Sequence, residues 1–322
     1  MYARIFGILS ISFLAACGGG GSNPITGGSS DDGVVTTPGA DPNTQSNNTA
    51  FLFDPANLLT ANQFTFTPGA TAAGNSITIN NLPFDNVSSQ GGSYQPRAGV
   101  ILPSGQVFDN AAAGGDPYLA VIVQSPSGTG ALAGVVATDV YQGFGYGGAY
   151  ISRPSSGLPA TRPAAYTYTG AYNGVRVIRQ TAGPNNAIQL TTGTANITVD
   201  LQDFDLTGAF RGFITGRQLF DENGNPIPGA LAPIELVITD INQATATTTG
   251  GTTRTINTTT GANAQSGSYV GMFSGPNGGE IVGYIVVEGD LSNIDPNFVV
   301  PGGGVSAVTG REVGGFVAVQ NP

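Results

Sequence analysis

Two clusters of acidic residues carry the side chains best suited to chemistry in this sequence. Asp200, Asp203 and Asp205 lie together in the stretch DLQDFD. Paired carboxylates about 5 to 9 Å apart can hydrolyse glycosidic bonds. In an alternating strand, however, Asp200 falls on one face while Asp203 and Asp205 fall on the other. We therefore expect solvated acids at a strand end, with a carboxylate-dependent hydrolase as a remote alternative.

The second cluster, from Asp221 to Asn225, places oxygen ligands at alternate positions, as at the start of a calcium loop. An EF-hand would then need a glycine at position 226 and a glutamate at position 232, where the chain has Pro226 and Ala232. An Asn-Gly turn between two strands explains the same residues without a metal. We predict no metal site, no cofactor and no catalytic residue.

Composition excludes most enzyme classes. The chain has 322 residues and no His, and all ten of its basic residues are Arg. Without His there is no Ser-His-Asp triad and no imidazole metal site, and without Lys there is no P-loop or Schiff base. A net charge of −10, with 9% charged residues, leaves little from which to build a phosphate-binding patch. We predict a protein that is neither an enzyme nor a nucleic-acid binder.

The N-terminus predicts a lipid anchor. Arg4 precedes an apolar run from Ile5 to Leu14, which is too short to span a bilayer and is typical of a signal peptide over residues 1–16. Leu-Ala-Ala-Cys then resembles a bacterial lipobox, with Cys17, the single cysteine, as the acylated residue. Acylation by several chains, palmitate among them, is enough for stable anchoring. The alternative is ordinary cleavage with Cys17 incidental.

Residues 17–50 are rich in Gly, Ser and Asn and predict a flexible tether. Random-coil scaling over this length gives an average reach of about 30 Å. No aspartate follows Cys17, which favours the outer membrane over retention at the inner membrane. Whether the protein faces the periplasm or the cell surface stays open.

The rest of the chain predicts an all-β protein with two parts. Residues 51–163 contain short apolar runs between turn residues, typical of a small β-rich domain with long loops, and residues 80–103 and 143–163 are predicted to be mostly loop. Residues 152–164 contain three prolines and predict a connector. From residue 164 to 322 the strands become longer and alternate regularly, with glycines inside them. About eight such strands favour a closed antiparallel barrel.

One stretch resembles a known family. Residues 267–284, GSYVGMFSGPNGGEIVGY, alternate Gly and aromatic residues before Gly-Pro, a turn and an acid, and residues 313–319 are similar to a closing strand. Both look like the transferrin-binding protein B type of β-barrel. The resemblance implies a surface lipoprotein with a handle domain, an eight-stranded barrel and an N-terminal tether. This chain has the size of one lobe where transferrin binders have two, so transferrin itself is not inferred.

A Tyr and Gly patch is the candidate partner-binding site. Tyr141, Phe144, Tyr146 and Tyr150 alternate with glycine, a composition common in recognition loops and also in ordinary strand packing. The sequence thus predicts an outer-membrane lipoprotein that binds an extracellular protein or nutrient carrier. A structural envelope lipoprotein without a specific ligand is the alternative. We also expect Arg176, Arg179, Arg211 and Arg217 to line one barrel face or to pair with Glu280 and Glu288.

Overall fold

The computed structural model of the chain consists of two antiparallel sheets and short 3₁₀ turns. It describes residues 48–80, 82, 92–110, 118–140, 143–160, 165–180, 187–202 and 208–322. No helix among these residues is long and apolar enough to cross a membrane. The predicted signal peptide, Cys17 and nearly all of the predicted tether lie outside the described residues.

The first sheet has the strand order β1-β8-β7-β6-β5-β4-β3-β2. Because β1 pairs with β8, the first strand of the sheet lies beside its last. Its strands are β1 (Thr49–Leu52), β2 (Gln63–Thr67), β3 (Ser76–Asn80), β4 (Ser93–Pro96), β5 (Gln106–Asn110), β6 (Tyr118–Gln124), β7 (Leu132–Ala137) and β8 (Gly147–Ser152).

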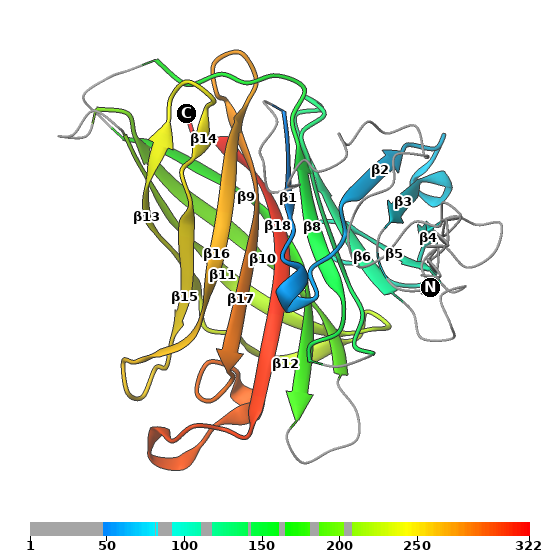
Figure 1. Ribbon diagram of the computed structural model, residues 1–322, viewed down its shortest axis with the longest axis vertical. Coiled ribbons are helices and arrows are strands. Elements are labelled where there is room, and N and C mark those ends of the chain that lie inside the picture. Colours follow the sequence, from blue (N-terminus) through cyan, green and yellow to red (C-terminus); the bar gives the residue numbers. More distant parts are fainter. Residues whose placement is uncertain are drawn as a thin grey trace, which may run out of the picture.

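The second sheet is a closed barrel (Figure 1). Its last strand pairs with its first along thirteen residues, from Val308 opposite Gln180 to Gln320 opposite Tyr168. The all-β fold with an eight-stranded barrel is therefore confirmed, with β12 and β14 as short additions. The strands are β9 (Tyr166–Gln180), β10 (Ala187–Asp200), β11 (Ala209–Asp221), β12 (Pro226–Ala230), β13 (Ile234–Asn242), β14 (Thr247–Thr248), β15 (Gly251–Ile256), β16 (Asn263–Ser274), β17 (Glu280–Asp290) and β18 (Val308–Gln320).

The alternation of glycine with aromatic residues is what lets the barrel close. Tyr269 lies opposite Gly251 and Phe316 lies opposite Gly283 in neighbouring strands. A Cβ on either glycine would overlap the opposite ring. An interior of eight strands is just wide enough for side chains to fill, so at these two positions the ring fits because the residue opposite it has no side chain.

The first sheet packs against the outside of the barrel and shares a core with it. Residues of β6, β7 and β8 meet outward-facing residues of the barrel in one buried cluster. Burial of each large aliphatic side chain stabilises the fold by roughly 1.5–3 kcal/mol, so the two sheets support each other. The barrel contributes Val175, Val177, Ile188, Leu190, Phe220, Met272, Val282, Tyr284, Val313 and Val317 to this cluster.

Polar contacts surround this shared core. The Tyr284 hydroxyl donates to the carbonyl of Phe51 at 3.0 Å. Arg311 donates to the carbonyl of Asn57 at 2.7 Å, and its guanidinium lies 5.0 Å from the ring centroid of Phe144. These contacts tie the barrel strands β17 and β18 to the first part of the chain.

The predicted connector is fixed to one end of the barrel. Its Arg153 is 3% exposed and donates to the carbonyls of Thr245, Ala246 and Phe273. Burial lowers the pKa of Arg153 to about 10. The guanidinium is therefore still charged at neutral pH when it donates hydrogen bonds to these three carbonyls of the barrel.

The two ends of the described chain lie at one end of the barrel, and a long loop projects from the other. Asn48 accepts a backbone hydrogen bond from Arg153, and Gln320 donates one to Gly279 beside the β16–β17 turn. The described chain thus begins and ends at one end of the barrel, the near end. The loop between β17 and β18 projects from the opposite, far end, at the bottom of Figure 1.

The sequence missed some short strands of the first sheet. It predicted mostly loop over residues 80–103 and 143–163, where the structure has β4 and β8. β4 is only four residues long, and β8 opens with two glycines, a composition that disfavours strands. Pairing with neighbouring strands overrides these local preferences. The domain boundaries at residues 50 and 163 stay predictions.

Replacing Gly315 with valine tests the shared core. A Cβ at this position of β18 would lie 2.7 Å from the Cβ of Ala133 in β7. We expect the crowding to lower the free energy of unfolding by about 1–3 kcal/mol, measured by urea unfolding with circular dichroism. Gly279→Val is the control because a Cβ there meets nothing within 4 Å. Equal effects of the two substitutions would contradict the shared core.

Candidate binding surfaces

Large rings fill the inside of the barrel. Tyr168, Phe210, Tyr269 and Phe273 are each at most 1% exposed, with edge-to-face contacts such as Phe210 on Phe273 at 6.3 Å between centroids. The hydroxyls of Tyr168 and Tyr269 donate to the carbonyls of Gly278 and Val237 at 2.8 Å. Rings that pack and bond in this way occupy the space that a small molecule would need.

A buried charge cluster lies within the far half of the barrel. Glu312 accepts hydrogen bonds from Tyr172 at 2.6 Å and Thr191 at 3.0 Å, and it forms an ion pair with Arg217. Nearby, Arg176 donates to Asp295 at 2.5 Å. The side chains of both ion pairs are at most 2% exposed. Two arginines and two carboxylates balance in charge, as buried ions must.

The environment of this cluster explains its pKa shifts. Burial lowers the pKa of Arg176, although the carboxylates of Asp295 and Glu312 act in the opposite direction. Burial also raises the pKa of Tyr172 well above its ordinary value, and the neighbouring Glu312 adds to this shift. The tyrosine is therefore a neutral hydrogen-bond donor at any physiological pH, which fits a structural role.

The far end has a pocket and exposed apolar side chains. The pocket measures about 410 Å³ and lies between the residues after β12, Thr258 and Thr259, and residues 293–299. Val299 and Val305 of the β17–β18 loop are 64% and 81% exposed. Ile101, 84% exposed, belongs to a loop that reaches the β11–β12 turn, where Arg97 donates to Asn223 at 3.3 Å. Val299 also lines the pocket, and an exposed aliphatic side chain beside a pocket is typical of a contact surface.

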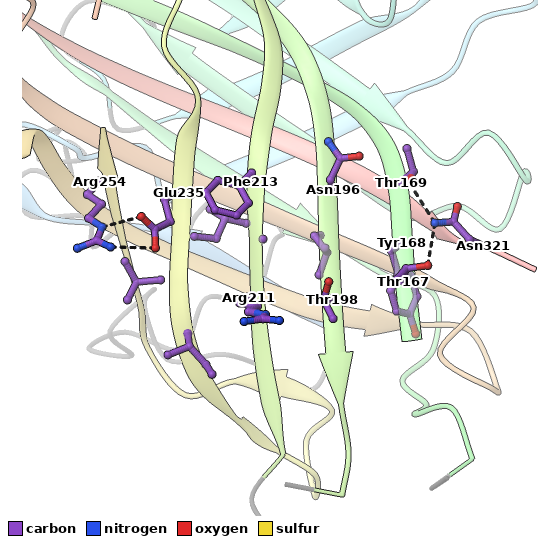
Figure 2. A pocket seen from close by; sticks show the side chains of 15 residues that line it. Thr167, Tyr168, Thr169, Asn196, Thr198, Arg211, Phe213, Glu235, Arg254 and Asn321 are labelled. Carbon is purple, nitrogen blue, oxygen red and sulfur yellow. Dashed lines mark hydrogen bonds and ion pairs between the residues drawn. The ribbon is translucent and has the colours of Figure 1, made fainter. Parts of the chain in front are cut away.

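A larger groove of about 790 Å³ crosses the outer wall of the barrel from β9 to β15 (Figure 2). Its floor is a row of cross-strand neighbours in which Asn196 lies opposite Phe213, and Phe213 opposite Glu235. Phe213 is 46% exposed and Ile238 is 60% exposed. The groove therefore offers apolar surface on an otherwise polar wall of threonine and asparagine.

Two arginines border the groove, and they differ in their ion pairing. Arg254 donates to both carboxylate oxygens of Glu235, at 2.7 and 3.1 Å, and these bonds raise its pKa. Arg211 is exposed and forms no ion pair with any residue that the structure describes. An unpaired guanidinium beside exposed apolar side chains can bind a carboxylate bidentately.

The predicted partner-binding residues lie on the first sheet. Phe144 is 9% exposed beneath Arg311, and Tyr146 and Tyr150 are half-buried. Tyr150 packs between Phe51 and Phe64, with ring centroids 4.9 and 5.3 Å away. These positions leave Tyr146 and Tyr150 partly accessible to a partner. Tyr141 lies outside the described residues.

The described acidic residues of the two predicted clusters form hydrogen bonds with residues close to them in the sequence. Asp200 accepts a hydrogen bond from the Gln202 backbone at 2.9 Å, while Asp203 and Asp205 lie outside the described residues. Asp221 accepts bonds from the backbone of Asn223 and Asn225 and from the Asn225 amide, and these bonds lower its pKa. The cluster is thus the predicted turn between β11 and β12.

The predicted arginine pairing was wrong. Arg176 and Arg217 point into the barrel, whereas Arg179 and Arg211 are exposed. Residues 176 and 179 are an odd number apart and fall on opposite faces of a strand. Glu288 pairs with Arg311, and Glu280 accepts bonds from Ser125 and Thr129 of the first sheet.

No family model matches this chain, and no curated protein is significantly similar to it. Among solved structures, a double mutant of transferrin-binding protein B from Haemophilus parasuis is 14% identical, with a TM-score of 0.37 over 79% of this chain and 42% of that one. Transferrin-binding protein B from serogroup B Neisseria meningitidis is 13% identical, with a TM-score of 0.36 over 77% and 41%. A surface lipoprotein is 15% identical, with a TM-score of 0.33 over 62% and 79%.

The chain therefore spans about two fifths of the length of the two transferrin-binding proteins. Membership of their family stays a prediction from the sequence.

The charge cluster makes a direct prediction about stability. Glu312→Gln leaves the buried Arg217 without a counter-charge, and we expect the free energy of unfolding to fall by about 3–5 kcal/mol. Glu235→Gln, which breaks the more exposed pair with Arg254, should cost about 1 kcal/mol or less. Urea unfolding of both variants measures the difference. Similar losses for the two would show that the cluster is not a structural requirement.

Proposed function

We propose that this protein is an outer-membrane lipoprotein, anchored through Cys17, that binds an extracellular protein with the far end of its barrel. The observation that carries the proposal is the separation of the two ends. The described chain begins at the near end, so a lipid anchor that precedes Asn48 is connected to the barrel at that end. The far end, with its pocket and loops, is then the part presented away from the membrane.

The chemistry of the far end suits a protein partner. Ile101, Val299 and Val305 are each more than 60% exposed; Ile101 belongs to the β4–β5 loop, and Val299 and Val305 belong to the β17–β18 loop. Val299 lines the far-end pocket. Exposed apolar side chains beside a pocket are typical of the centre of a protein interface, which excludes water when the partner binds. The loops of a rigid barrel are also the places where binding residues are usually found.

The partner contacts extend onto the first sheet in this proposal. Tyr146 and Tyr150 are half-buried, and Tyr141 belongs to the same β7–β8 loop region. Tyrosine contributes a large contact area at low entropic cost. Phe144, buried beneath Arg311, serves to hold this region against the barrel and is not a contact residue.

A small-molecule carrier is a weaker candidate because the barrel interior is filled by rings and by the charge cluster. The alternative of a structural envelope lipoprotein keeps the anchor and assigns no partner to the far end. The two functions make different predictions for substitutions of far-end side chains. A binding protein should lose affinity for its partner, whereas a structural lipoprotein should have no partner whose binding such substitutions could weaken.

Anchoring is tested with the full precursor expressed in a bacterium that lipidates exported proteins, beside Cys17→Ala. We expect a lipid mass on the peptide beginning at Cys17, partitioning into detergent, and digestion by protease added to intact cells. The alanine variant should lack the lipid mass and stay in the aqueous phase. An unmodified wild-type protein would overturn the anchor, and protection in intact cells with digestion after lysis would place the protein inside the outer membrane.

Partner binding is tested by immobilising the mature chain and exposing it to biotinylated extracellular fluid from the habitat of the source bacterium. We expect a captured protein whose affinity falls at least about tenfold when Ile101, Val299 and Val305 are all changed to serine, because hot-spot truncations cost more than about 1 kcal/mol each. Asn277→Ser, at the near-end turn, is the control and should bind like the wild type.

Equal capture by the wild type, the triple serine variant and Asn277→Ser would contradict a far-end site. The absence of any captured protein would favour the structural alternative. Matching circular dichroism and urea unfolding of the triple variant exclude a folding defect as the cause of lost binding.

A further inference from the structure

The outer wall of the barrel is covered on one side and open on the other. The first sheet covers outward-facing residues of β9, β17 and β18, among them Val177, Tyr284 and Val313. The groove of Figure 2 lies farther round the wall, on β10, β11, β13 and β15. It has the apolar Phe213 and Ile238 in its floor, and beside them Arg211, which forms no ion pair with a described residue. Such a groove suits a chain that has acidic residues next to aliphatic ones.

The tether contains a matching sequence. Residues 31–35 read Asp-Asp-Gly-Val-Val, so two carboxylates directly precede two aliphatic side chains. Between residues 18 and 47 the other acid is Asp41 and the other large aliphatic residue is Ile25. The acidic and apolar chemistry of the tether is thus concentrated in one short run.

The tether joins the described chain at the near end of the barrel, where β13 also ends. The carbonyl of Asn48 accepts a bond from Arg153, whose side chain donates to the carbonyl of Thr245 in the β13–β14 turn. Ile238 is four residues from the end of β13 at Asn242, or about 13 Å along the strand. The thirteen residues from Val35 to Asn48 have a root-mean-square span of about 20 Å as a random coil. The tether is therefore long enough to place Val35 in the groove.

We propose that residues 31–35 dock in this groove of their own chain, with Asp31 and Asp32 on Arg211 and with Val34 and Val35 on Phe213 and Ile238. A short linker gives its segment an effective concentration of around a millimolar. A contact with a dissociation constant of about 1 mM is then half occupied, so one ion pair and a small apolar contact suffice.

Docking would change how the protein is held at the membrane. It leaves residues 18–30 between the anchor and the docked segment, and these thirteen residues reach about 20 Å on average. The inference goes beyond the proposed function, because it depends neither on lipidation nor on an extracellular partner.

The test uses the mature chain with Cys17→Ser, which removes its single cysteine, and with two new cysteines at Val34→Cys and Ile238→Cys. We expect diamide to form an intramolecular disulfide, identified by peptide mapping and by a monomeric mass. The control pairs Val34→Cys with Val299→Cys, because Val299 at the far end is 64% exposed and Ile238 is 60% exposed. Disulfide formation at Ile238 should be at least tenfold faster.

The charges are tested in the same chain. Arg211→Gln, or Asp31→Asn with Asp32→Asn, should slow the disulfide at least fivefold, while Arg211→Asp combined with Asp31→Arg and Asp32→Arg should restore the rate. Asp203→Asn with Asp205→Asn is the control for a competing partner of Arg211 and should leave the rate unchanged. Equal rates at Ile238 and Val299, an insensitivity to these charges, or a disulfide that joins two molecules would each overturn the proposal.

Discussion

The packing of aromatic rings over cross-strand glycines is the interaction on which this structure depends. A barrel of eight strands has room inside for side chains and for little else. Tyr269 over Gly251 and Phe316 over Gly283 fill that room without forcing the strands apart. A ring also packs over a glycine outside the barrel, between two strands that are not paired: a Cβ on Gly134 of β7 would overlap the ring of Phe64 of β2. A barrel closed in this way is a scaffold, and recognition is left to its walls and loops.

The strands that carry the rings inward also carry a second apolar surface outward. In β17, Ile281, Ile285 and Val287 face the interior while Val282 and Tyr284 meet the first sheet. Both faces of β17 are therefore buried, and the first sheet covers apolar wall that would otherwise be exposed. One consequence is asymmetry: the part of the wall around Phe213 in β11 and Ile238 in β13 lacks this cover, and both side chains are exposed.

The sequence predicted what depends on local pattern and missed what depends on register. Long alternating strands such as β10 and the turn after Asp221 follow directly from residue order. The continuous apolar run from Ile281 to Val287 was a usable signal that β17 is buried on both faces, because a strand with one solvated face alternates. The charge cluster joins Arg176 and Arg217 to acids 119 and 95 residues away, so no spacing along the chain predicts it. The groove was missed for the same reason, since its floor comes from five strands.

The chain has few positively charged side chains, and one of the few that are exposed lies in the groove. The chain has ten arginines and no lysine against twenty acids. Arg153, Arg176 and Arg217 are buried among barrel carbonyls and carboxylates, and Arg97, Arg254 and Arg311 pair with acids. Of the described arginines, this leaves Arg179 and Arg211 exposed without an ion pair to a described residue. Arg211 is the one that stands beside exposed apolar side chains. In a chain that is so acidic, a positive charge placed there favours an acidic ligand, as the proposed docking of Asp31 and Asp32 requires.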